Sequence, residues 1–315
     1  MTDDAAVAFE ASRPKLMAIA YRMLGSVVEA EDVIGDVAER WLAANRDEVR
    51  IAEAWLVTAT TRRALDVLRS ARVQRESYLG VWLPEPLATS DIPGENMERV
   101  ESLTVSFLLL LERLTPIERA VFVLHDVLGY SYEEVSEAVG RGEPACRQAL
   151  RRARQHVTLP EPRMAADVEQ AESVAERFML AGLTGDVDAL MATLAPDVVL
   201  TSDGGGVVYA AIRPVRGVTR VTRFIQNLVN RGGLAENPFI VVCELNGCPG
   251  VILQAADRWI TIGIESEGEL VTAINVVVNP DKLERIVASI PEAAGRPGPR
   301  ANPDRFRHRQ GRAVT

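Results

Sequence analysis

Arginine and glutamine side chains recur on one face of a short segment near the middle of the chain. Arg147, Arg151 and Arg154 follow the i, i+4, i+7 spacing of one helix face, and Gln148 and Arg152 lie beside them. Arginine and glutamine bind guanine and adenine edges through two hydrogen bonds, and arginine also binds phosphates. The segment therefore predicts a helix that reads duplex DNA, although an ordinary solvated helix face would show the same spacing.

The residues before this segment predict the elements that would hold it. Residues 115–118 (TPIE) form a capping box with proline at the first helical position, and residues 131–134 (SYEE) form a second one. Gly140 is suited to end the helix that the second capping box starts, and Pro144 opens the arginine-bearing helix. The face that this helix would bury consists of Cys146, Ala149, Leu150 and Ala153. Such a helix-turn-helix places its second helix in the major groove.

Acidic side chains line one face of a predicted helix nearer the N-terminus. Glu29, Asp32 and Asp36 follow i, i+3, i+7 spacing, opposite an apolar stripe that ends at Trp41. The next predicted helix, residues 52–74, is basic. Its arginines include Arg62, Arg63, Arg69 and Arg72. An acidic face and a basic helix in one small domain could bind a basic protein surface and a nucleic-acid backbone.

Length and composition limit the classes of protein that fit. The chain has 315 residues, which suggests two domains or several small ones, and its net charge of −9 argues against a protein that coats nucleic acid non-specifically. Its three cysteines, Cys146, Cys243 and Cys248, are too few for a disulfide framework. No segment is apolar enough for a transmembrane helix or a secretory signal, so we expect a cytoplasmic protein without membrane contact.

Proline- and glycine-rich stretches divide the chain into five segments. They are a helical domain (9–77), a linker (78–98), a helix-turn-helix domain (99–158), a C-terminal domain (168–290) and a tail expected to be disordered (291–315). In the C-terminal domain we expect helices at 168–183, 186–194 and 218–230. We expect strands at 197–203, 239–245, 250–256, 258–265 and 270–278. Helices followed by a curved antiparallel sheet predict a cone-shaped α+β fold, so the whole chain is multidomain.

Three segments resemble the bacterial extracytoplasmic function sigma factors, in the order of that family. Residues 30–41 (AEDVIGDVAERW) resemble the helix of region two that binds core RNA polymerase. Residues 55–70 resemble the helix beside the −10 element, and residues 114–154 resemble region four, which reads the −35 element. The resemblance implies a transcription initiation factor whose partners are core RNA polymerase and promoter DNA.

The same resemblance assigns site residues. Polymerase contacts would come from Glu29, Asp32 and Asp36. DNA contacts would come from Arg62, Arg63, Arg69, Glu143, Pro144, Arg147, Gln148, Arg151 and Arg152. The loop 45–51 would receive a base flipped out of the non-template strand. Arg62 stands where many members of the family have asparagine.

Three further motifs resemble the SigJ-type subgroup, whose members carry a fused SnoaL-like domain of the NTF2-like cone fold. They are WLPEP (82–86), DGGG (203–206) and NPDKL (279–283). Val207 stands where the subgroup often has lysine. We expect the linker to dock on the C-terminal domain and control the spacing of the two DNA readers. The expected regulatory contacts are Trp82, Leu83, Pro84, Asp203, Gly204, Gly205, Gly206, Asn279, Pro280, Asp281 and Lys282.

Two other functions fit parts of the pattern. A DNA-binding regulator that works without polymerase could use the same helix-turn-helix, usually as a dimer on a palindrome. A SnoaL-like enzyme with an accessory DNA-binding region could use Asp203 as a base, and Asp257 could line its pocket or be a turn residue. The C-terminal domain before the tail has no histidine, and Cys243 and Cys248 have no further zinc ligands nearby in the sequence. We therefore expect no catalytic residues, metal or cofactor, and at most an unknown small ligand in a pocket.

Overall fold

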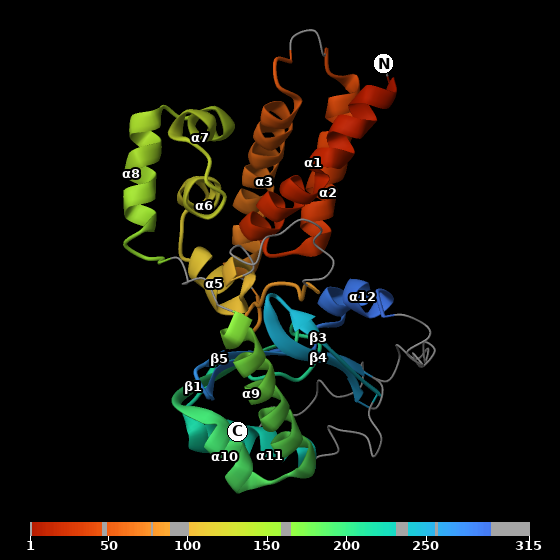
Figure 1. Cartoon of the computed structure of the whole chain (residues 1–315), viewed down its shortest axis with the longest axis vertical. Coiled ribbons are helices and arrows are strands. Elements are labelled where there is room, and N and C mark those ends of the chain that lie inside the picture. Colours follow the sequence, from red (N-terminus) through yellow and green to blue (C-terminus); the bar gives the residue numbers. More distant parts are fainter. Residues whose placement is uncertain are drawn as a thin grey trace.

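The computed structural model describes residues 2–45, 49–76, 78–88, 101–158, 165–230, 239–255 and 258–290. Two helical parts lie together above a sheet-containing C-terminal part (Figure 1). We call them the N-terminal part (2–76), the helix-turn-helix part (101–158) and the C-terminal part (165–290), and we call residues 78–88 the linker. Several expectations fall wholly or partly outside the described residues: the centre of the loop 45–51, the second half of the expected linker (89–98), the end of the expected strand 250–256, Asp257, and the tail 291–315.

The N-terminal part is a bundle of three helices. They are α1 (Thr2–Leu24), α2 (Val27–Ala43) and α3 (Ala52–Glu76). Ser26 starts α2, because its side chain accepts a hydrogen bond from the Glu29 amide at 3.2 Å. Trp41 holds α2 on α1 through a 2.9 Å hydrogen bond from its indole nitrogen to the Ala5 carbonyl oxygen. Helix α1 begins at Thr2, seven residues before the expected start of the helical domain at residue 9, and it contains Pro14.

The helix-turn-helix part follows its capping signals closely. Its elements are η3 (Glu101–Leu103), α5 (Val105–Leu111), α6 (Pro116–Phe122), the π-helical turn η4 (Val123–Val127), α7 (Tyr132–Val139) and α8 (Glu143–Ala153). Both predicted capping boxes form, on Thr115 and Ser131. Gly140 ends α7 in the left-handed conformation that glycine adopts without strain. The predicted buried face of α8 is buried.

The C-terminal part is a six-stranded sheet with helices on both faces. In the sheet order β2-β1-β6-β5-β4-β3, the strands are β1 (Leu194–Asp203), β2 (Val215–Arg216), β3 (Phe239–Leu245), β4 (Cys248–Ala255), β5 (Arg258–Glu267) and β6 (Leu270–Val277). The expectation of a purely antiparallel sheet is wrong, because β1 pairs with β6 in parallel. Hairpins join β3 to β6 in succession, but no hairpin joins β1 to β6.

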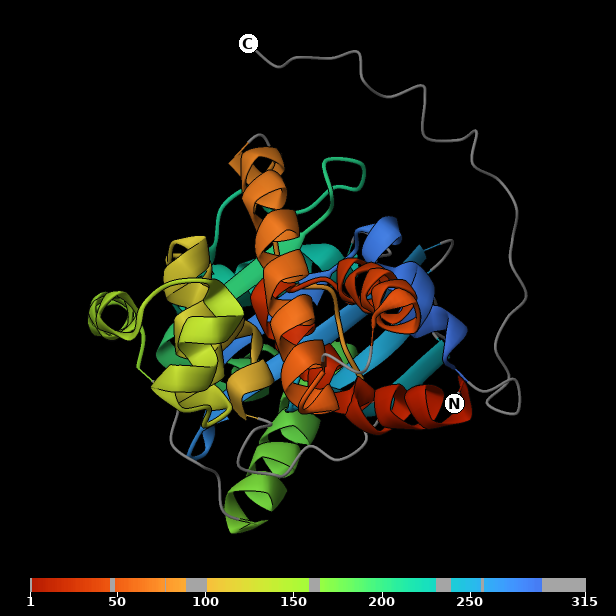
Figure 2. The ribbon, with the colours of Figure 1, turned by 90° about the horizontal axis from the view of Figure 1, so that it is seen from above.

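The two faces of this sheet have different partners. Helices α9 (Ala165–Thr184), α10 (Val187–Thr193) and α11 (Val218–Leu228) cover the face below the sheet in Figure 1. Helix α12 (Pro280–Ala288), which we did not predict, packs with Leu83 of the linker on the opposite face. Seen from above, the helical parts lie over the strands (Figure 2). None of the helices in the described ranges has the length and hydropathy needed to cross a bilayer.

Candidate functional site

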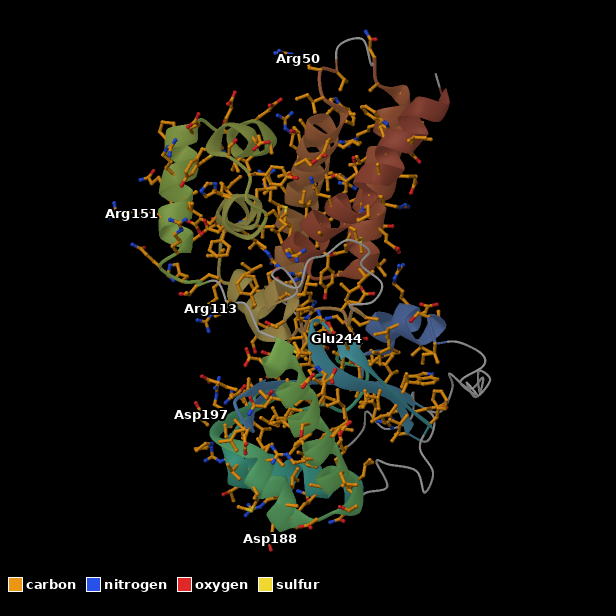
Figure 3. All side chains as sticks on the ribbon, viewed as in Figure 1. Arg50, Arg113, Arg151, Asp188, Asp197 and Glu244 are labelled. Atoms are coloured by element: carbon orange, nitrogen blue, oxygen red, sulfur yellow. The ribbon has the colours of Figure 1, made fainter. Side chains whose placement is uncertain are left out.

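The exposed face of α8 carries the predicted DNA readers. Arg147, Gln148 and Arg151 are exposed, and Arg151 projects away from the fold (Figure 3). Arg147 forms a 2.8 Å ion pair with Glu143 one turn earlier, and its guanidinium lies 4.0 Å from the centre of the Tyr132 ring. Pro144 is exposed at the start of the helix. These contacts orient Arg147 while leaving the face open to a ligand.

Arg152 of α8 and Arg154, which follows the last residue of the helix, hold α8 against its neighbours. Arg152 forms a 2.6 Å hydrogen bond from its Nε to Glu118, and Arg154 forms two hydrogen bonds to Asp126 at 2.8 and 2.7 Å. Burial raises the pKa of Glu118, but hydrogen bonds from Arg152 and Thr115 outweigh it and lower that pKa overall. Arg152 therefore has a structural partner besides its predicted contact with DNA.

The predicted acidic face of α2 is divided between solvent and the interior. Asp32 is exposed. Asp36 forms a 2.5 Å ion pair with Arg63, so the structure brings together one residue predicted to contact polymerase and one predicted to contact DNA. Glu29 is partly buried beside Arg75, and burial raises the pKa of its carboxyl group.

The two helical parts share a hydrophobic core and pack against each other through α3 and α7. Arg62 of α3 donates hydrogen bonds to the carbonyl oxygens of Glu137 at 2.8 Å and Ala138 at 3.4 Å, at the C-terminal end of α7. A cation is favourable at that end of a helix, where carbonyl groups lack partners. Arg69 remains exposed and pairs with Asp66 at 2.9 Å. Arg62 therefore binds α7 while remaining exposed to solvent, and we call this packing of α3 against α7 the closed arrangement.

All three motifs of the expected regulatory contact meet at one buried carboxylate. Asp203, at the end of β1, accepts hydrogen bonds from the Tyr78 hydroxyl at 2.5 Å and from the Leu83 and Gly205 amides at 2.9 Å. Lys282 donates to the same carboxylate at 2.8 Å and also to the Leu83 carbonyl oxygen. We call this set of contacts between the linker and the C-terminal part the linker dock.

The glycines beside Asp203 and the start of α12 complete the linker dock. Side chains at Gly204, Gly205 or Gly206 would collide with or press against Val208, Asn279 and Leu79. The Asn279 side chain caps α12, whose first residues are Pro280 and Asp281, and it donates a 3.0 Å hydrogen bond to the Tyr78 hydroxyl. The backbone in this region therefore allows the close approach that the dock requires.

Trp82 of the linker lies between two cations. Arg75 of α3 lies 3.7 Å from the ring centre, and Lys282 lies 4.2 Å from it. Such cation–π contacts add roughly 0.5–2 kcal/mol each, depending on burial. Pro84, two residues after Trp82 in the linker, is buried. The linker tryptophan thus joins the N-terminal part to the C-terminal part.

Sequence reasoning missed the roles of Glu85 and Asn246. The Glu85 carboxylate accepts hydrogen bonds from the Val27 amide at 2.7 Å and the Val28 amide at 3.2 Å, so it caps α2 from the linker. Burial raises the pKa of this carboxyl group. The Asn246 side chain binds the Tyr21 hydroxyl at 2.6 Å and also contacts the linker and the helix-turn-helix part. Its Asn-Gly pair signals a hairpin turn, but nothing in the sequence indicates this second role.

Comparisons with known proteins agree with this geometry. Residues 8–73 match the sigma-70 region 2 family and residues 104–157 match the sigma-70 region 4 family. The ECF RNA polymerase sigma factor SigJ of Mycobacterium tuberculosis (strain ATCC 25618 / H37Rv) is 39% identical over 290 residues, 87% of this chain and 92% of the relative. The probable ECF RNA polymerase sigma factor SigI of the same strain is 29% identical over 295 residues, 91% of this chain and 98% of the relative.

A solved structure extends the likeness to the C-terminal part. The crystal structure of the Mycobacterium tuberculosis extracytoplasmic function sigma factor SigJ matches with a TM-score of 0.71 and 33% identity, covering 89% of this chain and 98% of that chain. The predicted fold class is confirmed, apart from the parallel strand pair. The described ranges contain no group of three or more His, Cys, Asp or Glu side chains that could hold a metal ion. The chain belongs to the extracytoplasmic function (ECF) RNA polymerase sigma factors, which are transcription initiation factors and not enzymes.

Proposed function

We propose that the chain binds core RNA polymerase through α2 and directs it to promoters, with α8 reading the −35 element and α3 contacting DNA near the −10 element. The observation that carries this proposal is the α8 face, where Arg147, Gln148 and Arg151 are exposed while the opposite face of the helix is buried. That arrangement suits a recognition helix in the major groove. The exposed Asp32 on α2 is available to a basic protein surface.

The charge of the chain supports a division of labour with polymerase. Its net charge of −9 disfavours tight binding of the free protein to DNA. Polymerase would hold the two DNA-reading parts at the right spacing, so that two weak contacts act as one through effective concentration. Sigma factors act together with RNA polymerase. A regulator that acts without polymerase would instead need to bind DNA tightly as a free protein.

The packing of α3 against α7 in the closed arrangement suggests that DNA binding is controlled by the separation of these two helices. Arg62 binds the end of α7 and Arg63 pairs with Asp36, so DNA would have to compete with these protein partners for both side chains. The linker dock fixes the segment that joins the two DNA-reading parts. We infer that the C-terminal part restrains the separation of α3 and α7, and that polymerase binding must overcome this restraint.

Charge reversal at Asp32 tests the polymerase contact. Asp32→Lys in the full chain should weaken binding to purified core RNA polymerase by about tenfold or more, because it places a cation against a basic surface. Asp188→Lys is the matched control, since Asp188 is exposed at the far end of the C-terminal part (Figure 3). Equal affinity of the Asp32 and Asp188 variants for core enzyme would remove α2 from the polymerase interface.

A further inference from the structure

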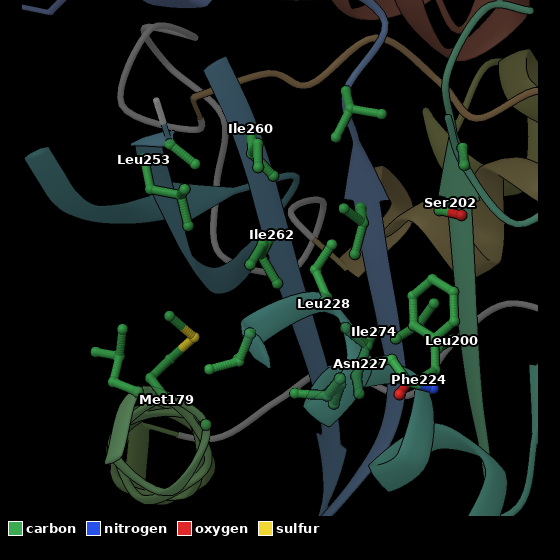
Figure 4. Close-up of a pocket in the computed structure, with 18 of the residues that line it drawn as sticks. Met179, Leu200, Ser202, Phe224, Asn227, Leu228, Leu253, Ile260, Ile262 and Ile274 are labelled. Carbon is green, nitrogen blue, oxygen red and sulfur yellow. The ribbon is translucent and has the colours of Figure 1, made fainter. Parts of the chain in front are cut away.

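A pocket of about 420 Å³ lies in the C-terminal part, between the sheet and helices α9 and α11 (Figure 4). This is the face of the sheet opposite the linker dock. The volume is within the range of small-molecule sites in proteins. Because a cavity of roughly 150 Å³ accommodates benzene, this pocket has room for about two or three rings.

The lining of the pocket is apolar and carries little charge. Leu253, Ile260 and Ile274 are buried in the sheet wall, and among the described lining residues there is no carboxylate or imidazole. Arg258 also lines the pocket and already has an interaction partner within the chain. A buried charge without a partner costs several kcal/mol, so the lining favours a neutral occupant.

The polar residues that line the pocket are Ser202, Tyr209, Asn227 and Arg258, and of these Ser202 is the buried one. Ser202 of β1 is 4% exposed, and its hydroxyl oxygen accepts a 2.8 Å hydrogen bond from the Ala211 amide. A hydroxyl group that accepts one hydrogen bond can still donate its own hydrogen. Ser202 can therefore donate to an acceptor atom on a bound molecule.

We propose that this pocket binds a neutral, largely apolar small molecule with a hydrogen-bond acceptor, and that residues 203–211 transmit its occupancy to the linker dock. The transmission to the linker dock rests on the proposed restraint by the C-terminal part. The binding of a ligand in the pocket does not depend on that restraint. The ligand would be of the chemical class of small aromatic or polycyclic ketones, ethers and arylamines, all of which are uncharged at neutral pH.

Strand β1 provides the first connection between the pocket and the dock. Successive side chains of a strand point to opposite faces of its sheet. Leu200 and Ser202 line the pocket, whereas Asp203 points to the other face and binds Leu83 and Lys282. A ligand that shifts the end of β1 would therefore move the carboxylate at the centre of the dock.

The loop after β1 provides the second connection. Gly206 approaches Leu79 of the linker so closely that an added Cβ would lie 3.3 Å from the Leu79 side chain. Tyr209 and Ala210, a few residues later in the same loop, line the pocket. Tyr209 is 82% exposed, so one loop joins a solvent-exposed residue of the pocket lining to a glycine that lies against the linker.

Strand β6 and the residues that follow it repeat this arrangement. Val276 and Val278 line the pocket, and Val277 packs with Leu83 on the opposite face. Asn279, the next residue, binds the Tyr78 hydroxyl. Two adjacent strands thus carry neighbouring residues to the pocket and to the linker.

A matched pair of dyes tests the ligand class. N-phenyl-1-naphthylamine is neutral, and 8-anilino-1-naphthalenesulfonate has the same ring skeleton with an added anionic group. In fluorescence titrations of the full chain, we expect the neutral dye to bind at micromolar concentration and the sulfonate to bind at least about tenfold more weakly. Equal affinity for both dyes would overturn the assignment of a neutral ligand.

A glycine in α9 allows the pocket to be filled without disturbing the fold. Gly182 lines the pocket, and an added Cβ would meet nothing within 4 Å. Gly182→Leu should place a side chain in the cavity while favouring the helix, because leucine is a better helix former than glycine. We expect this variant to lose at least about tenfold in affinity for the neutral dye. Leu180→Ala, an exposed position on the same helix, should bind like the wild type.

Hydrogen exchange tests the transmission. The neutral dye should change the exchange rates of residues 78–88 and 203–211 in the wild type and leave them unchanged in Gly182→Leu. If Gly182→Leu binds the dye as tightly as the wild type does, the dye does not bind in this pocket. If the dye binds without changing the exchange rates of these segments, occupancy of the pocket is not transmitted to the linker dock. Both readouts are independent of promoter-directed transcription, so their failure is distinguishable from failure of the proposed sigma function.

Discussion

Lys282 and Asp203 form an ion pair with a 2.8 Å distance from Nζ to Oδ2, in which the two side chains are only 12% and 0% exposed. Burial lowers the pKa of Lys282, and the carboxylate of Asp203 opposes that effect. A buried pair contributes little net stability compared with apolar residues, but the loss of one partner leaves an uncompensated charge. The pair therefore makes the linker dock specific, because the dock fits only when both groups are in place.

Asp203→Asn should open the linker dock. The substitution leaves Lys282 buried without a counter-ion, which costs about 3–5 kcal/mol in comparable pairs. We expect amide hydrogen exchange of residues 78–88 to accelerate strongly, and the double variant Asp203→Asn/Lys282→Met to recover part of the protection. Exchange as slow as that of the wild type would show that the ion pair does not hold the linker.

The same variant should change activity. If the dock restrains opening, Asp203→Asn should raise promoter-directed transcription when core polymerase is limiting, because polymerase then has less restraint to overcome. Asp188→Asn, a change of the same type at an exposed position, is the control. An unchanged or lower transcript yield would contradict restraint by the C-terminal part.

Gly25 lies just before α2 and Gly35 lies inside it, and replacing each with alanine should change the stability of the chain in opposite directions. Gly25 has φ +67°, and an added Cβ would lie 2.7 Å from Trp82, so Gly25→Ala should destabilise the chain by about 1–2 kcal/mol or more. Gly35, inside α2, has nothing within 4 Å of an added Cβ, so Gly35→Ala should stabilise the chain by about 0.8–1 kcal/mol. Thermal unfolding measures both variants, and shifts in the same direction would contradict the close packing of Trp82 on Gly25.

The Glu85 cap of α2 should give the chain a pH-dependent stability. Burial raises the pKa of Glu85 above its ordinary value of 4.5, so the folded state holds the proton more tightly than the unfolded state. Stability from this group is fully present below the unfolded pKa and is lost as pH rises through the folded pKa. The loss is about 1.4 kcal/mol for each unit by which the two pKa values differ.

Glu85→Gln isolates this contribution, since glutamine keeps the size of the side chain and an oxygen acceptor. We expect the wild type to lose stability relative to Glu85→Gln as pH rises from below 4.5 through the raised pKa. Urea unfolding of both proteins at a series of pH values measures the difference. A difference that is constant, or that grows in favour of the wild type with rising pH, would contradict the raised pKa.

The sequence predicted the local elements of this fold better than their long-range contacts. The helix-turn-helix could be placed because its signals are local: Thr115 and Ser131 cap their helices, and Gly140 needs the left-handed conformation. The parallel pairing of β1 with β6 was missed, because it joins segments that no turn connects. Helix α12 was also missed, although Asn279 and Pro280 are ordinary signals for a helix start.

The linker dock could be predicted from the resemblance to a known family, and not from local signals in the sequence. The linker motif, Asp203 and Lys282 were linked by resemblance, and the structure places them in hydrogen-bond contact. No periodicity indicates that Arg62 binds the end of α7 or that Asn246 joins three parts of the chain. Those contacts depend on how the parts pack together, which a single sequence does not encode in its spacing.

The most direct test of the account is run-off transcription with core RNA polymerase on a promoter that the wild-type chain selects. The account predicts one defined start site that requires the chain. Arg151→Ala should reduce initiation by roughly tenfold, since a base-reading arginine contributes about 1–3 kcal/mol. Arg223→Ala, an exposed arginine of the C-terminal part, should leave initiation unchanged. Failure of the wild-type chain to direct core polymerase to any start site would contradict the central claim.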